Sequence, residues 1–67
     1  MITLTTKSGK KIGVNVEQIV TIESDRDVSG PVTKVNMTNG YVYVRETLEE
    51  ILQMVVDQYF SGGDSNG

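Results

Sequence analysis

The dipeptide Asn39-Gly40 separates two segments, residues 32–38 and 41–44, in which apolar and polar residues alternate. Asn and Gly both tolerate a positive φ, which a type I′ turn requires at its two central positions, so this arrangement predicts a β-hairpin with a two-residue turn. Such a turn fixes the register and places Val35 opposite Val44. Because side chains alternate along a strand, one face of the hairpin would be apolar and would need partners from the rest of the chain. That face contains Val35, Met37, Val42 and Val44.

The opposite face of the hairpin is the candidate binding surface, and it contains Lys34, Asn36, Tyr41, Tyr43 and Arg45. The same register puts Lys34 opposite Arg45, where like charges repel unless water, an acid or an anionic ligand lies between them. Tyrosines beside cations can also stack bases, as in single-strand nucleic-acid binders. Three interpretations stay open: a solvated face with cross-strand tyrosine packing, a surface that contacts a partner, and a site for a nucleotide or another anionic ligand.

The start of the chain predicts a second hairpin. Ile2 and Leu4 alternate with threonines, a pattern typical of a strand, and a glycine at position 9 marks a turn. A three-residue loop over 7–9 with the glycine left-handed places Leu4 opposite Ile12 and Ile2 opposite Val14. A two-residue loop would send Ile12 to the other face. Burial selects register, so we expect the three-residue loop.

A third strand is predicted over residues 19–24, which read IVTIES. Asn15 precedes it and is a candidate to cap a short turn, because its side chain can accept a hydrogen bond from nearby backbone. Either Ile19 or Val20 could point inward. We expect Val20 to share the inner face with Ile22, which is two residues further on.

Residues 25–31 (DRDVSGP) are polar and end in Gly30-Pro31, which predicts a loop. The hairpin of residues 32–44 follows this loop. The chain up to Val44 therefore predicts four or five strands in meander order, each joined to the next by a short connection.

The period of the apolar residues changes to helical spacing after Thr47. Thr47 and Glu50 form a capping box, in which each side chain satisfies an amide of the first turn. We expect a helix over residues 48–59 that is ended by Gly62-Gly63. Its inward stripe would seal the apolar sheet face, and the stripe consists of Leu48, Ile51, Leu52, Val55 and Tyr59.

Three further apolar residues flank that stripe: Met54, Val56 and Phe60. They could cover the edges of the sheet or contact another subunit, because apolar patches mark interfaces. The predicted fold is α+β: a small antiparallel meander with one C-terminal helix packed on one face. It forms a single domain over residues 1–60, followed by a flexible tail over 61–67.

A chain of 67 residues buries a small core, and small domains add disulfides, a metal or self-association. The sequence contains no Cys and no His, so it can form no disulfide and lacks the usual zinc ligands. We therefore expect a homo-oligomer and no metal site.

The formal net charge is −3, and an acidic domain is a poor match for the phosphate backbone of nucleic acid. The apolar runs are far shorter than the ~20 residues that cross a bilayer, so we expect no membrane insertion. The first residues alternate instead of forming a secretory signal. These observations predict a cytoplasmic protein.

General acid–base catalysis needs a histidine or a carboxyl group with a shifted pKa, and the carboxylates here lie in predicted turns and on the helix surface. Residues 8–10 (SGK) resemble part of a phosphate-binding loop but lack its spaced glycines and following helix. The sequence therefore predicts a protein that is not an enzyme, with no catalytic residues and no cofactor.

Several short motifs occur in an order that resembles a known family: MITLT at the start, Gly9-Lys10, Val14-Asn15, Ile22-Glu23, Thr38-Asn39-Gly40, and the acidic run of residues 44–50. Over residues 1–58 the chain is similar to the small FlbD/SwrD-like proteins of bacterial flagellar gene clusters. It departs from them at Val16, where the family has Pro, and in the length of residues 25–31.

The resemblance implies a non-enzymatic accessory protein that supports flagellar motility or swarming. Related short sequences also occur in phage genomes. The alternative is therefore a phage or mobile-element protein that binds a host protein or a small anionic, nucleotide-like ligand.

Overall fold

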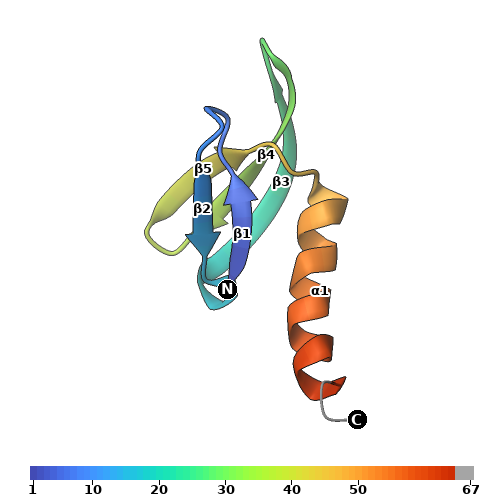
Figure 1. The fold of residues 1–67 in the computed structure, drawn as a ribbon. Helices are drawn as coiled ribbons and strands as arrows, with labels where there is room; N and C mark the ends of the chain where they lie inside the picture. Colours follow the sequence, from blue (N-terminus) through green and yellow to red (C-terminus); the bar gives the residue numbers. More distant parts are fainter. Residues whose placement is uncertain (65–67) are drawn as a thin grey trace.

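The computed structural model describes the backbone of residues 1–64 and the side chains of residues 1–60. Two antiparallel sheets are followed by one helix, which confirms the α+β class (Figure 1). The strands form two separate sheets, of two and three strands, instead of one continuous meander. The elements are β1 (Ile2–Thr5), β2 (Lys11–Val14), the 3-10 helix η1 (Val16–Gln18), β3 (Ile19–Asp27), β4 (Gly30–Met37), β5 (Gly40–Val44) and α1 (Leu48–Asp64).

The β1–β2 hairpin has the predicted register, with Ile2 opposite Val14 and Leu4 opposite Ile12. The amide of Thr6 donates to the carbonyl of Lys10 across 2.8 Å and closes a three-residue loop. Gly9 in this loop has φ 95°, a conformation that residues with a side chain rarely adopt. The loop therefore has the predicted three residues, and this length lets Leu4 and Ile12 both face the core.

The connection from β2 to β3 is capped as predicted. The Oδ1 atom of Asn15 accepts a hydrogen bond from the amide of Glu17 across 3.1 Å, and Asn15 is the N-cap of η1. Val16, the first residue of this turn, is buried in the core.

Val20 lies at a β-bulge, and its predicted inward orientation is wrong. Ile19 pairs with Met37 while Thr21 pairs with Asn36, so the register shifts between Ile19 and Thr21. The extra residue interrupts the alternation of sides. As a result Val20 is 63 % exposed. Ile19 packs against the core together with Ile22.

Residues 25–31 extend a long hairpin, so the predicted loop is wrong. Asp27 pairs with Gly30 and Arg26 pairs with Pro31, which leaves only two residues for the turn. Asp27 Oδ1 stabilises this turn by accepting from the amide and the hydroxyl of Ser29 at 2.8 and 2.6 Å. Pro31 lies outside residues 33–37, the part of β4 that pairs with β5, so its missing N–H removes no bond between those strands.

The β4–β5 register differs from the prediction by two residues. Val35 pairs with Val42 instead of Val44, and Met37 pairs with Gly40, so the turn is Thr38-Asn39. Gly40, with φ 147°, adopts the positive φ here, and no other residue type does so in the described part of the chain. A shift of two residues leaves every side chain on its original face, so the predicted apolar face survives the error.

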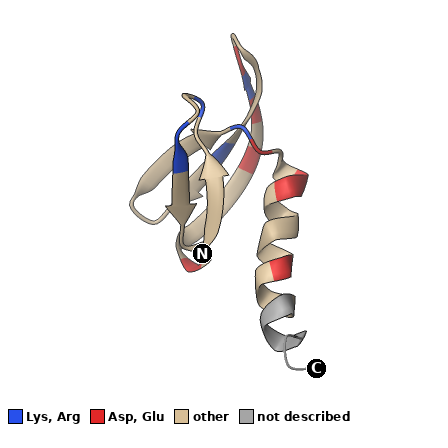
Figure 2. Cartoon of the chain, viewed as in Figure 1, with Lys and Arg blue, Asp and Glu red and all other residues tan. Residues whose placement is uncertain are grey.

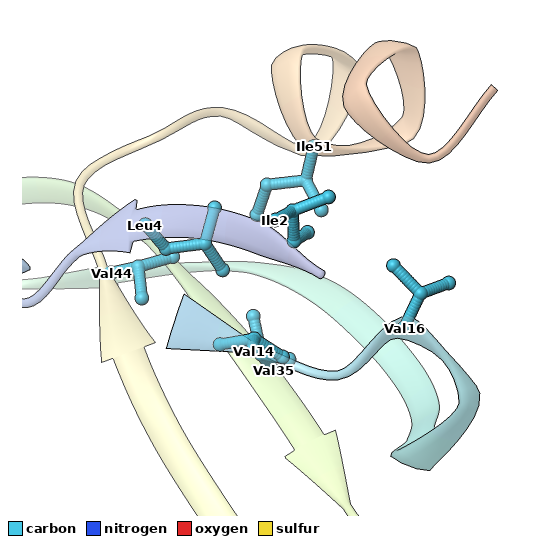
Figure 3. Close-up of a cluster of buried hydrophobic side chains, with 7 residues drawn as sticks. All are labelled: Ile2, Leu4, Val14, Val16, Val35, Val44 and Ile51. Atoms are coloured by element: carbon cyan, nitrogen blue, oxygen red, sulfur yellow. The ribbon is translucent and has the colours of Figure 1, made fainter. Parts of the chain in front are cut away.

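The core lies between the two sheets, and α1 closes one side of it (Figure 3). The end of β1 meets the end of β5, where the amide of Arg45 donates to the carbonyl of Thr5 across 2.8 Å. Ile51 of α1 is fully buried and points toward the β1 side chains. The buried apolar residues of the cluster are Ile2, Leu4, Val14, Val16, Val35, Val44 and Ile51.

The capping box of α1 is confirmed. The amide of Thr47 donates to Glu50 Oε1 across 2.8 Å, and the amide of Glu50 donates to Thr47 Oγ1 across 3.0 Å. The helix continues through the Gly62-Gly63 pair that was expected to end it. The predicted tail therefore contributes residues 61–64 to the helix, and residues 65–67 lie outside the described part.

The predicted buried stripe of α1 is wrong in two of its five members. Ile51 is fully buried, but Leu52 is 47 % and Tyr59 is 60 % exposed. The cause is that the β1–β2 hairpin, and not the helix, covers the apolar face of the three-stranded sheet. The helix lies beside β1 and β3 and buries only a narrow side. The Met1 amino group also contacts α1, because it donates to Gln58 Oε1 across 2.8 Å.

Candidate interaction site

An exposed apolar stripe runs along α1 on the side that faces away from Ile51. At ~100° per residue its members fall within an arc of about 100°, and the centre of that arc lies about 130° around the helix from Ile51. The members are Leu52 (47 % exposed), Val56 (44 %), Tyr59 (60 %) and Phe60 (68 %). We call this surface the α1 stripe. Apolar patches of this kind on small proteins are often functional.

The structure places the three predicted contact residues on two different sides of α1. Val56 and Phe60 belong to the α1 stripe, whereas Met54 is half-buried and packs against the core. Leu52 and Tyr59, which the sequence predicts in the core, are exposed members of the α1 stripe. Helical spacing could not have found them, because the apolar residues of α1 occupy both sides of the helix.

The charges on α1 are all acidic in the described residues (Figure 2). Glu49 lies at the N-terminal end of the α1 stripe, and Asp57 lies beside it and accepts from Gln53 Nε2 across 2.9 Å. The helix sequence contains no Lys or Arg. An anionic lipid surface is therefore a poor partner, because amphipathic helices that bind such surfaces carry cations beside the apolar face.

The second candidate surface is the outer face of β4 and β5. Asn36 pairs with Tyr41 and Lys34 pairs with Tyr43. The Lys34 ammonium lies 4.6 Å from the centre of the Tyr41 ring, and the two tyrosine rings meet edge to face at 5.6 Å. Tyr41 remains 61 % exposed. Four of the five predicted residues are therefore brought together.

Arg45 is the predicted residue that does not join this face. It lies beyond β5 and donates from Nε and Nη2 to the carbonyl of Lys7 at 3.2 and 2.9 Å. The expected repulsion between Lys34 and Arg45 is therefore wrong. In the observed register Lys34 pairs with Glu23 of β3, and Glu23 Oε2 also accepts from Asn36 Nδ2 across 3.2 Å.

Lys7 is a member of the second surface that the sequence did not indicate. Its ammonium lies 5.8 Å from the centre of the Tyr43 ring and forms an ion pair with Asp27. The Lys7 side chain, followed by hydrogen bonds from Ser29, lowers the pKa of Asp27 to about 2. This ion pair joins the turn of the β1–β2 hairpin to the end of β3, and no local pattern in the sequence indicates it.

Two shallow hollows flank the connection between β5 and α1. One of about 160 Å³ lies against Pro31, Val32 and Leu48. The other, of about 520 Å³, is open and is lined by Lys11, Arg45, Glu46 and Glu50 among others.

Glu46 in the second hollow is held in its ionised form. Partial burial acts to raise its pKa, but hydrogen bonds from Thr5 and the charge of Lys11 outweigh burial, and the pKa lies below its ordinary value. A general acid or base at neutral pH needs a pKa moved toward neutrality. The shift of Glu46 has the opposite direction, so this carboxylate acts as a structural acceptor.

The arrangement therefore offers contact surfaces: an apolar helix stripe and a tyrosine–lysine face. Within residues 1–64, no helix has the length and apolar character to cross a membrane. Searches of curated proteins and of solved structures find no match. The family model described as flagellar and swarming motility proteins matches residues 1–61. The chain thus belongs to the FlbD family of flagellar and swarming motility proteins.

Proposed function

We propose that this protein is a non-enzymatic, cytoplasmic accessory module of the flagellar or swarming machinery, and that it works by protein contact through the α1 stripe. The partner of the stripe is either a further copy of the same chain or another protein of that machinery. The stripe is the observation that carries it, because Phe60 at 68 % and Tyr59 at 60 % exposure leave two aromatic rings in water. Aromatic residues are enriched where proteins bind one another.

The experiment is complementation of a deletion strain of the native host. Val56→Glu puts a charge in the middle of the α1 stripe, where a buried contact cannot easily accommodate it. Val28→Glu is the matched control, since Val28 is fully exposed in the turn between β3 and β4. We expect Val56→Glu to abolish the restoration of swarming at unchanged protein level, and Val28→Glu to restore it. Wild-type swarming by Val56→Glu would contradict the proposal.

A second candidate function comes from the tyrosine–lysine face. Lys34 and the exposed Tyr41 ring form a cation beside a flat aromatic surface, which favours the binding of a small anionic, nucleotide-like ligand. This function would suit a phage or mobile-element protein. NMR titration with a nucleoside monophosphate should shift the Lys34 and Tyr41 resonances in the wild type and should leave the Tyr41 resonances of Lys34→Gln unchanged. Unchanged spectra at millimolar ligand would remove this candidate.

A further inference from the structure

We propose that the α1 stripe binds the α1 stripe of a second copy of this chain, with the two helices antiparallel and Val56 at the twofold axis. This inference rests on the proposed function, because it names the partner that the stripe contacts. It adds the identity of that partner, the direction of its helix and the residue at the centre of the contact.

The spacing of the stripe places Val56 at its centre. Leu52 lies four residues before Val56 and Phe60 lies four residues after it, so all three lie on one side of α1. In an antiparallel pair centred on Val56, Leu52 of one copy meets Phe60 of the partner subunit. Val56 meets its own equivalent, and its small side chain lets the helix axes approach to the ~8–10 Å of packed helices.

The charge of Glu49 selects the antiparallel direction. Glu49 lies seven residues before Val56, and therefore on the same side of α1 at the start of the helix. Parallel helices would put the two Glu49 carboxylates together, which is unfavourable. Antiparallel helices separate them to opposite ends of the contact and also set opposite ends of the helix dipoles side by side.

The central part of the stripe carries no charge that would oppose a second copy. From Leu52 to Val56 the helix reads LQMVV, and the next acid, Asp57, lies to one side and is hydrogen-bonded to Gln53. The far half of α1 also extends past the sheets, so the body of the molecule does not cover the stripe (Figure 1). A partner helix can therefore reach all four apolar residues.

The size of the stripe fits a reversible dimer. An aromatic side chain carries about 150–250 Å² of surface, so Tyr59 and Phe60, at 60 % and 68 % exposure, supply roughly 200–300 Å² per copy. Leu52 and Val56, each nearly half exposed, enlarge this area. The sum is smaller than the ~800 Å² per partner of a standard stable interface. We therefore expect dimers whose population rises with protein concentration.

Disulfide mapping tests this geometry directly, because the chain has no Cys of its own. At the twofold axis a residue meets its own equivalent, and a disulfide needs a Cα–Cα distance of about 4.4–6.8 Å. We expect Val56→Cys to form covalent dimers at least ten times faster than Val28→Cys under mild oxidation. Leu52→Cys should crosslink poorly to itself and well in a mixture with Phe60→Cys.

Two results would overturn the inference. Self-crosslinking of both Leu52→Cys and Phe60→Cys as fast as that of Val56→Cys would show a parallel pair. Crosslinking of Val56→Cys no faster than of Val28→Cys, together with a monomer by sedimentation equilibrium of the wild type at millimolar concentration, would exclude a second copy. If Val56→Glu still abolishes swarming in that case, the proposed function stands with a different partner, so the two failures are distinguishable.

Discussion

Both carboxylate oxygens of Glu46 accept hydrogen bonds from the backbone amide of Thr5, at 2.8 and 3.0 Å. Glu46 belongs to the short connection between β5 and α1, and Thr5 ends β1, so this contact joins the two sheets where the helix begins. The carbonyl of Glu46 is also held, because the buried Thr33 donates to it from Oγ1 across 2.6 Å. Glu46 therefore fixes the direction in which α1 leaves the sheets.

We expect Glu46→Ala to lower the free energy of unfolding by about 1.5–3 kcal/mol, the range for a hydrogen bond to a charged group. The variant leaves the amide of Thr5 without its acceptor. Glu46→Gln keeps a neutral acceptor at the same place and should lose less. Urea denaturation of the three proteins, followed by circular dichroism, measures the difference. An unchanged free energy of unfolding in Glu46→Ala would mean that the contact between Glu46 and Thr5 does not contribute to stability.

Stability should fall as the pH drops from about 4 to 2. The pKa of Asp27 is lowered from 3.8 to about 2 in the folded protein by Lys7 and Ser29, and the pKa of Glu46 is lowered as well. The unfolded chain therefore binds more protons than the folded chain in this window, so unfolding is favoured by acid. The stability that these two carboxylates provide is complete above their pKa values in the unfolded chain. It is lost as the pH falls through their pKa values in the folded protein.

Urea midpoints measured between pH 2 and pH 6 test this dependence. Asp27→Asn and Lys7→Gln each remove the ion pair, so the urea midpoint of both variants should fall less than that of the wild type as the pH drops from about 4 to 2. High salt should flatten the wild-type curve in the same direction, because it screens exposed charges. If the urea midpoints of all three proteins fall equally as the pH drops, the ion pair does not contribute to stability.

The two hairpins show what a sequence can and cannot determine. The β1–β2 register was predictable because only a three-residue loop puts both Leu4 and Ile12 in the core. The β4–β5 register was not, because a turn at Thr38-Asn39 and a turn at Asn39-Gly40 bury the same side chains. Burial cannot choose between registers that differ by two residues, and the choice depends on local backbone energies.

The helix shows the same division between local and long-range information. Its capping box involves residues three apart and was predictable, whereas its buried side depends on which element covers the sheet. The Lys7–Asp27 pair joins positions twenty residues apart in two different hairpins, and no periodic pattern connects them. For these reasons the tyrosine–lysine face was largely predictable, whereas only two of the four residues of the α1 stripe, Val56 and Phe60, were.

Gly40→Val should destabilise the protein by about 1–3 kcal/mol, because a β-branched residue is strained at φ 147°. The φ is decisive, since a Cβ at Gly40 would meet no atom within 4 Å. Asn39→Ala is the informative control: every described residue other than glycine has a negative φ, so this change should cost less than about 0.5 kcal/mol. A large loss for Asn39→Ala would instead support a left-handed Asn39 and the register that the sequence predicted. Thermal denaturation measures both variants.

Ile51→Ala and Leu52→Ala should separate the two sides of α1. Ile51 is fully buried against β1, so its truncation leaves a cavity and should cost about 2–5 kcal/mol. Leu52 is 47 % exposed in the isolated chain, so the same truncation should cost less than about 1 kcal/mol at micromolar concentration, where the weak dimer is dissociated. Urea denaturation at that concentration compares the two variants. If Leu52→Ala is as destabilising as Ile51→Ala, then α1 is rotated and the stripe from Leu52 to Phe60 belongs to the core, because only burial makes an apolar truncation so costly.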